Sequence, residues 1–245
     1  PGVARVQLDF DLKEPPTTQG PAGPLMKQSI EGVRHIIAVA SGKGGVGKST
    51  VASNLAVALA ATGAKVGLCD CDLYGPSMAL MFGTNERPMA TDQNEIVPVE
   101  CHGLKLMSMG LLLDDASPVI VRGPMATRYV QQFLRQCVWG ELDYLILDLP
   151  PGTGDIQLTL CQRTQLTGAI VVSTPQDVAL LDARKALDMF QKLKTPVLGL
   201  IENMSTFCCP NCGHETQIFG HGGVRAEAEK LGLPFLGELP LALSV

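Results

Sequence analysis

A glycine-rich segment between an apolar run and a helical pattern constrains this chain more than any other feature. It reads GKGGVGKST and matches the pattern GxxxxGK(S/T). Glycines at these spacings let consecutive backbone N–H groups point toward one anion, and the following helix adds the positive end of its dipole. The lysine at its end bridges outer phosphates and the next hydroxyl can hold Mg²⁺, whereas the alternative is a tight glycine turn without a ligand. The predicted nucleotide-binding residues are Gly42, Lys43, Gly44, Gly45, Val46, Gly47, Lys48, Ser49 and Thr50.

Short apolar runs alternate with helical patterns from about residue 32 onward. The runs lack a polar–apolar alternation, as expected of strands that are buried on both faces. Their regular alternation with helices predicts an α/β fold, a doubly wound and mainly parallel sheet of the P-loop NTPase type. The expected strands are 35–40, 65–69, 144–147, 169–173, 197–201 and 235–239, and the expected helices are 49–61, 125–138, 156–165, 177–194 and 223–231. Two short runs, 96–99 and 104–107, predict a hairpin inserted at the edge of the sheet.

The first 29 residues differ in pattern from the rest. Apolar and polar residues alternate with period two over residues 1–12, as in the last strand of an upstream domain. Residues 13–29 contain four prolines and show no periodicity. We therefore expect a remnant of an upstream domain at 1–12, a linker at 13–29 and one compact domain at 30–245.

Net charge and hydropathy restrict the classes of molecule that the chain can bind. The formal net charge is −5, which disfavours a chain that coats nucleic acid or an anionic membrane. The longest apolar stretches, such as residues 36–40, are much shorter than the roughly 18 residues that a membrane span needs. No basic segment followed by an apolar run opens the chain, so we expect a cytoplasmic protein that binds neither nucleic acid nor membrane.

Carboxylates follow two of the expected strands. Asp148 ends an apolar strand and precedes the loop PPGTGD, and Asp70 and Asp72 end another. Beside a phosphate-binding loop, Asp148 and Asp70 are expected to hold Mg²⁺ with Ser49, directly or through water, and Asp72 to orient an attacking water. Turn or helix capping is the alternative for the pair at 70 and 72.

Three cysteines form a cluster, while the other five are scattered through apolar segments and are expected to be reduced core thiols. Cys209 and Cys212 form a CxxC turn that lets two thiolates face one metal. A tetrahedral zinc ion or an iron–sulfur cluster takes four ligands, so the chain supplies half a site and a two-fold dimer would complete it. Two alternatives stay open, a thiol–disulfide redox pair and a zinc knuckle completed by His214 or His221.

Lys43 is a second lysine in the loop, and one active site does not require it beside Lys48. A residue of this kind can reach phosphates bound by a facing subunit, as an arginine finger does. We therefore expect Lys43, Lys48 and Asp72 to be the catalytic residues.

Residues 42–50 are similar to the deviant Walker A motif of the MinD/ParA group of dimerising ATPases. A fuller set of motifs resembles the Mrp (ApbC-like) branch, the iron–sulfur cluster carrier ATPases, over about residues 27–240. These motifs are 70–77 (DCDLYGPS), 122–125 (RGPM), 148–155 (DLPPGTGD), 173–177 (STPQD), 202–204 (ENM) and the Cys209/Cys212 pair.

The resemblance implies a slow ATP hydrolase that binds ATP and Mg²⁺. It implies a homodimer in which Cys209 and Cys212 of two chains bridge a [4Fe-4S] cluster, which is passed to apo iron–sulfur proteins with the help of cluster assembly factors. It also implies that Asn203 reads the adenine ring and that Pro240 lines the base pocket. Relatives continue beyond this proline and some carry a MIP18-type domain upstream, so we expect a truncated C-terminal end and assign residues 1–12 to the tail of that domain.

A different class of function stays open at this point. A MinD/ParA-like partitioning or positioning ATPase with a structural zinc knuckle would share the phosphate-binding loop. The acidic pI and the lack of a basic patch or an amphipathic terminal helix count against it.

Overall fold

The computed structural model describes residues 27–93, 95–112 and 123–242. The expected upstream remnant at 1–12 and most of the expected linker lie outside these residues, as does Arg122. Of the linker, residue Gln28 pairs with Thr164, and the Lys27 ammonium donates a hydrogen bond to the Leu193 carbonyl.

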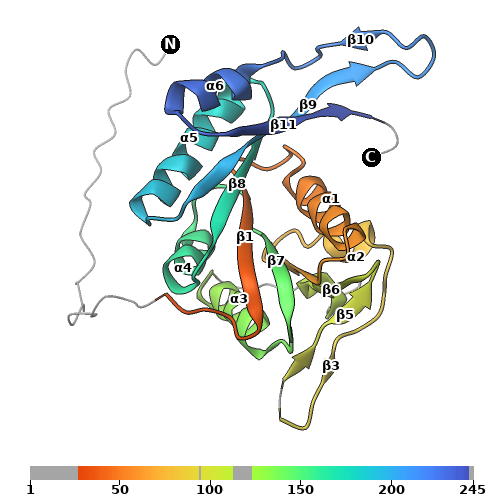
Figure 1. The fold of residues 1–245 in the computed structure, drawn as a ribbon, viewed down its shortest axis with the longest axis vertical. Coiled ribbons are helices and arrows are strands. Elements are labelled where there is room, and N and C mark those ends of the chain that lie inside the picture. Colours follow the sequence, from red (N-terminus) through yellow and green to blue (C-terminus); the bar gives the residue numbers. More distant parts are fainter. Residues whose placement is uncertain (1–26, 94, 113–122, 243–245) are drawn as a thin grey trace, which may run out of the picture.

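A nine-stranded sheet forms the centre of the molecule (Figure 1). Its strands follow the order β10-β9-β8-β1-β7-β2-β6-β5, and β11 pairs with β9. All pairs are parallel except β5 with β6 and β9 with β10. The bounds are β1 (Val33–Ser41), β2 (Val66–Asp70), β5 (Val99–Cys101), β6 (Leu104–Met107), β7 (Leu142–Asp148), β8 (Gly168–Ser173), β9 (Val197–Cys208), β10 (Glu215–Thr216) and β11 (Phe235–Leu241).

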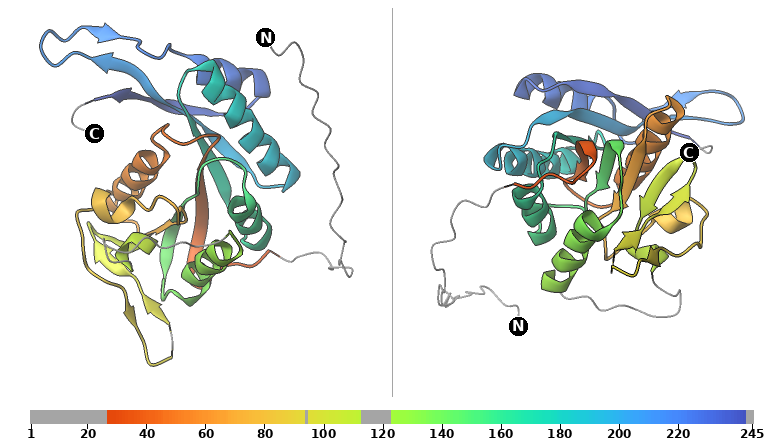
Figure 2. Two further views of the ribbon diagram at one scale, coloured as in Figure 1. Left: turned by 180° about the vertical axis from the view of Figure 1, so that it is seen from behind. Right: turned by 60° about the horizontal axis from the view of Figure 1, so that its bottom comes forward.

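Helices cover both faces of this sheet, as a doubly wound fold requires (Figures 1 and 2). One apolar core lies between the sheet and α1, and a second core packs α3, α4, α5 and α6 against the opposite side. None of the described helices is both long and apolar enough to cross a bilayer. The helices are α1 (Lys48–Ala61), α2 (Met78–Met81), α3 (Gly123–Gln136), α4 (Asp155–Arg163), α5 (Asp177–Lys192), α6 (Gly223–Leu231) and a 3₁₀ turn (Met109–Leu111).

The predicted fold class is confirmed, but one detail of the edge hairpin was wrong. The segment expected as one strand, 96–99, is split because Pro98 has no N–H to donate to a ladder. Its first half, β4 (Ile96–Val97), pairs with β3 (Met89–Ala90) in a separate two-stranded sheet. Its second half begins β5, and the hairpin β5–β6 joins the main sheet through β6, which runs parallel to β2.

Strand β9 is longer than expected, since it ends at Cys208 rather than at residue 201. The extension is stabilised by partners from later in the chain, because β11 pairs with it as far as Phe207 and β10 pairs with Phe207 and Cys208. The hairpin β9–β10 therefore projects beyond the rest of the sheet (Figure 1).

The parallel arrangement brings the carboxyl ends of β1, β2 and β7 to one edge of the sheet. Val39 of β1 and Asp70 of β2 are both in register with Asp148 of β7. In open α/β sheets this edge is where ligands bind.

Candidate functional site

The glycine-rich loop turns directly from the end of β1 into α1. Gly47 adopts a left-handed conformation with φ of 79°, which an L side chain rarely adopts. A Cβ atom at Gly42 would lie 2.1 Å from the carbonyl carbon of Asp182, so only glycine lets the loop approach α5. The hydrogen bonds of the described residues include no acceptor for the backbone N–H groups of residues 44–50. Those donors, at a helix N-terminus without acidic residues, form a cradle for an anion.

Lys48 is buried at the start of α1 and contacts the carboxylate that ends β7. Its Nζ lies 2.5 Å from Asp148 Oδ1, and the two side chains are 6% and 0% exposed. Ser49 Oγ donates a hydrogen bond to the other oxygen, Asp148 Oδ2, at 2.6 Å. Two residues of the predicted phosphate-binding loop are thus held by one carboxylate.

Asp70 places a second carboxylate beside this group. It is buried, and its carboxylate accepts hydrogen bonds from Ser108 Oγ at 2.9 Å and from the Asp72 backbone N–H at 3.0 Å. Burial, followed by the charge of Asp148, raises the pKa of Asp70 to about 7. Burial likewise raises the pKa of Asp148, although Lys48 and Ser49 act in the opposite direction.

This donor set fits Mg²⁺. Ser49 offers a hydroxyl, Asp70 and Asp148 offer carboxylates, and hard oxygen ligands are those that Mg²⁺ prefers. Two mutually repelling carboxylates beside the single ammonium of Lys48 leave an uncompensated negative charge when both are ionised, and a cation would relieve it.

Asp72 and Lys43 lie at the margin of the group. Asp72 Oδ1 accepts a hydrogen bond from the Gly75 N–H at 3.3 Å, which is the turn-capping contact. Asp72 is also near enough to raise the pKa of Asp148. Lys43 is partly buried, and its ammonium has no ion-pair or hydrogen-bond partner within the part of the chain that the structure describes.

Asn203 reaches the loop from β9. Its side-chain Nδ2 donates a hydrogen bond to the Val46 carbonyl at 2.8 Å, so the residue lies against the phosphate-binding loop. Leu239 of β11 is in register with Asn203. The next residue, Pro240, is exposed and lies where the register of β11 against β9 shifts. The structure thus places Asn203 against the loop and Pro240 in the same region.

The cysteine pair lies in the turn of the β9–β10 hairpin. The Cys209 N–H donates to the His214 carbonyl at 2.9 Å, and the Gly213 N–H donates to the Cys209 carbonyl at 2.8 Å, which closes the turn. Backbone N–H groups of Asn211 and then Cys212, together with the Cys212 thiol, lower the pKa of Cys209. A more acidic thiol favours the thiolate that binds soft metals.

Among the described residues, no third protein ligand lies with these thiols. Across the described residues, the only three metal-binding side chains that lie together are Glu202, His221 and Glu238. Neither His214 nor His221, the two histidines considered for a zinc knuckle, lies in a three-ligand group with these thiols among the described residues. His221 faces Glu238, with Nε2 and Oε2 3.0 Å apart.

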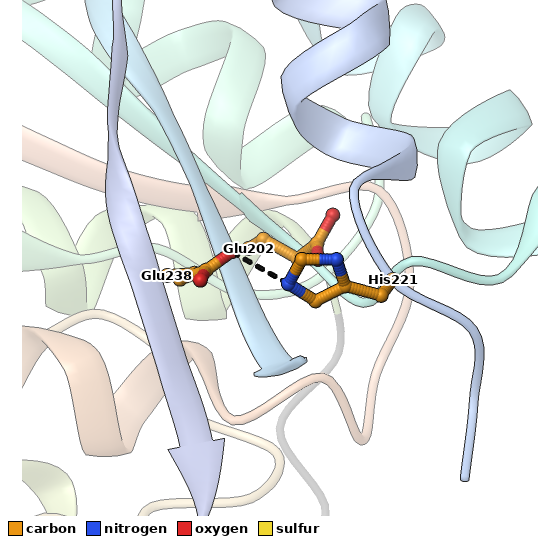
Figure 3. A group of neighbouring side chains, drawn as sticks. All are labelled: Glu202, His221 and Glu238. Carbon is orange, nitrogen blue, oxygen red and sulfur yellow. Dashed lines mark ion pairs between the residues drawn. The ribbon is translucent and has the colours of Figure 1, made fainter. Parts of the chain in front are cut away.

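Figure 3 shows this second cluster, which sequence reasoning missed. Glu202 is fully buried, and its two oxygens accept hydrogen bonds from the Gly222 and Val224 N–H groups, each at 2.8 Å. The carboxylate therefore caps the N-terminus of α6, while the His221–Glu238 pair ties the preceding loop to β11. The cluster anchors α6 to the strand that carries Asn203.

Ser108 was also missed, although one signal was present. It directly follows β6, which runs parallel to β2, so its hydroxyl lies at the same sheet edge as Asp70. Four of the scattered cysteines are buried, and burial raises the pKa of Cys137 and Cys161 to about 12, as expected of unreactive core thiols.

Comparison with known proteins adds a family and relatives. Residues 32–245 match the family model described as ParA, NUBPL iron-transfer P-loop NTPase. The chain is 53% identical over 218 residues to an iron–sulfur cluster carrier protein of Pseudomonas fragi, covering 88% of this chain and 76% of that one. It is 50% identical over 223 residues to the iron–sulfur cluster transfer protein NUBPL of Dictyostelium discoideum, covering 90% and 69%. A carrier protein of Escherichia coli is 54% identical, but the chain spans only 59% of its length.

Solved structures agree on the fold. A nucleotide-binding protein from Archaeoglobus fulgidus in complex with ADP, a structure that also reports cobalt, superposes with a TM-score of 0.76 at 42% identity, covering 86% of this chain and 84% of that one. The cell division ATPase MinD of Pyrococcus furiosus superposes with a TM-score of 0.59 at 21% identity, covering 84% and 83%. The likeness to MinD shows the fold alone.

Proposed function

Because the chain belongs to the NUBPL iron-transfer P-loop NTPases of the ParA group, we propose that it is a nucleotide-dependent carrier that binds an iron–sulfur cluster and delivers it to apo-proteins. The names of its relatives support this function, since proteins at 50–54% identity are iron–sulfur cluster carrier or transfer proteins. The likeness to MinD, at 21% identity, gives no comparable support for a partitioning role.

The observation that carries the proposal is the Cys209–Cys212 turn. It presents two thiols at the end of a projecting hairpin, and the pKa of Cys209 is lowered by neighbouring N–H groups. Clusters of the 4Fe–4S type are ordinarily held by four cysteine thiolates, and each chain supplies two at this place. We therefore propose that two chains related by a two-fold axis hold one [4Fe-4S] cluster as cargo between them.

The nucleotide in this proposal is ATP. The N–H groups of residues 44–50 would hold its phosphates, and Lys48 would exchange its contact with Asp148 for one with the outer phosphates. Asn203 donates its amide N–H to Val46, which leaves Oδ1 as an acceptor for the adenine amino group. Bound Mg²⁺, held by Ser49, Asp70 and Asp148, would neutralise charge on the phosphates.

Hydrolysis would need two further residues. Asp72, near Asp148, would orient the attacking water. Lys43, which has no acidic partner among the described residues, would reach the phosphates bound by the other subunit. The domain that does this is proposed to span residues 30–245 and to work in the cytoplasm with cluster assembly factors.

Anaerobic reconstitution with iron and sulfide, followed by sedimentation and iron analysis, tests the cluster site. The wild type should carry about four irons per dimer, half of what one cluster in each chain would give. Replacing Cys209 and Cys212 by serine should remove the iron and weaken the dimer, and Cys208→Ser is the matched control. Four irons on a monomer, or iron that the double variant retains, would contradict the bridging site.

Transfer of the cluster to an apo-protein needs a separate measurement. The loaded protein should restore the activity of an apo enzyme that needs a 4Fe–4S cluster, and the rate should depend on added Mg–ATP. A loaded protein that never donates its cluster would be a storage or structural iron–sulfur protein instead of a carrier.

A further inference from the structure

The loop after β7, residues 150–154, lies against the phosphate-binding loop. Pro150 and Pro151 have no N–H group, so this segment can donate few backbone hydrogen bonds. The Gly152 N–H donates to the carbonyl of Ser41, the last residue of β1, at 3.0 Å. A Cβ atom added at Gly44 would lie 3.9 Å from Pro151 Cγ, so the two loops are close neighbours.

One buried side chain holds the other end of this loop. Gln157 of α4 is fully buried, and its Nε2 donates a hydrogen bond to the Pro150 carbonyl. Because a carbonyl can only accept, this contact fixes the orientation of the amide, with the NH₂ group toward the loop. The amide oxygen, Oε1, has no partner, and it is the only buried side-chain nitrogen or oxygen of the described residues in that state.

The unpaired oxygen bears on whether Gln157 is buried to fill the core or to hold the loop. If Gln157 served only to fill the core, an apolar side chain of similar size would do so without leaving a polar atom unsatisfied. The amide has one partner, the Pro150 carbonyl. That carbonyl is two residues beyond Asp148, the partner of Lys48 and Ser49.

We propose that Gln157 is a positioning residue of the nucleotide site, which fixes the loop 150–154 where it can meet the outermost phosphate of ATP. This inference rests on the proposed function and adds a residue outside the motifs that bind nucleotide. The loop is held at Gly152 by β1 and at Pro150 by Gln157. ADP lacks the outermost phosphate, so we expect Gln157 to contribute to the affinity for ATP and little to the affinity for ADP.

Titration with a non-hydrolysable ATP analogue and with ADP, each with Mg²⁺, tests the proposal. Gln157→Leu should weaken binding of the analogue roughly three- to tenfold, the equivalent of one net hydrogen bond, and change ADP binding less than about twofold. Gln162→Leu is the matched control, since Gln162 is exposed on the same helix. An unchanged ratio of the two affinities in Gln157→Leu overturns the inference, whereas a wild type that binds neither nucleotide overturns the proposed function.

A second variant covers the case in which the leucine protein fails to fold. In Gln157→Glu an ionised carboxylate cannot donate to the Pro150 carbonyl, but a protonated one can. Affinity for the ATP analogue, taken relative to wild type at each pH, should therefore recover as the pH falls from 8 to 6. A relative affinity that is constant over this range, or equal to wild type at pH 8, overturns the inference.

Discussion

At the scale of single residues, the nucleotide site is a balance of buried charges. Lys48 and Ser49 share the carboxylate of Asp148, and Asp70 lies in register beside it. Besides burial, the charge of Asp148 raises the pKa of Asp70, and the charge of Asp72 raises the pKa of Asp148. When both carboxylates are ionised, the site carries a net negative charge that Lys48 only partly compensates. Such a site suits a ligand that binds together with a cation.

Replacing Lys48 by alanine should remove nucleotide binding. The ammonium makes a buried, charge-assisted contact to phosphate, and its loss costs about 2–5 kcal/mol of binding free energy. Fluorescence titration with a labelled nucleotide measures this effect. Lys65→Ala is the control, because Lys65 is 66% exposed and lies away from the loop. Unchanged affinity in the Lys48 variant would contradict the assignment of the loop.

Asp70→Asn should change how stability depends on pH. Folding raises the pKa of Asp70 from 3.8 to about 7, so the folded state binds the proton more tightly than the unfolded state. The free energy of unfolding of the wild type therefore falls as the pH rises from about 4 to about 7, by at most about 4 kcal/mol from this group. Asparagine does not titrate, so the variant should gain stability over the wild type through this window and hold the gain above it.

Urea unfolding of the nucleotide-free proteins at pH 5 and pH 8 measures this difference. Asp188→Asn serves as the control, since Asp188 is exposed on α5. A gap between Asp70→Asn and wild type that is the same at both pH values would show that Asp70 is already ionised at pH 5.

At the scale of elements, β9 connects the parts of the site. Asn203 on this strand contacts the phosphate-binding loop, Glu202 caps α6, and the strand then continues into the turn that carries Cys209. The pairing of β11 with β9 is irregular between Leu239 and Leu241, next to the place where Asn203 meets the loop. One strand thus links the nucleotide region to the cysteines.

Glu202→Gln should destabilise the protein through α6. The carboxylate accepts hydrogen bonds from two N–H groups, whereas the amide offers one oxygen and turns an NH₂ group toward the second N–H. An unsatisfied buried donor costs about 1–3 kcal/mol. Chemical denaturation measures the loss, with Glu229→Gln on the exposed side of the same helix as the control. Equal stability of the two variants would mean that the cap contributes little.

At the scale of the whole molecule, two features of the described chain are incomplete within a single subunit. The Cys209–Cys212 turn gathers no third ligand from the described residues, and the Lys43 ammonium contacts no carboxylate among them. A closed two-fold dimer would supply both missing partners at once. The dimer is therefore the unit at which the proposed chemistry has to be tested.

Mixing two slow variants tests whether Lys43 acts across the subunit interface. Lys43→Ala and Asp72→Asn should each bind ATP and hydrolyse it slowly. In an equal mixture about half of the dimers contain both chains, and each of these has one intact site, so about a quarter of wild-type turnover should return. A steady-state phosphate-release assay measures it. If the mixture is no faster than either variant alone, Lys43 acts within its own subunit.

Local patterns were sufficient to predict most of the longer elements and the phosphate-binding loop. Helix α6 spans the expected residues 223–231, α1 begins one residue before the expected start, and the loop lies between β1 and α1 as its motif required. Glycine spacing and runs of apolar side chains act over a few residues, so the printed sequence contains them directly.

Only the tertiary structure decided which distant residues meet. The lengthening of β9 to Cys208, the hydrogen bond of Ser108 to Asp70, the cap that Glu202 forms on α6 and the unpaired oxygen of Gln157 depend on the order of strands and on helix packing. The sequence by itself determined a parallel α/β fold, a phosphate-binding loop and a pair of thiols. The structure decided that His221 lies beside Glu238 and Glu202 and not with those thiols, because the pairing of β11 with β9 brings these two glutamates, distant along the chain, into register.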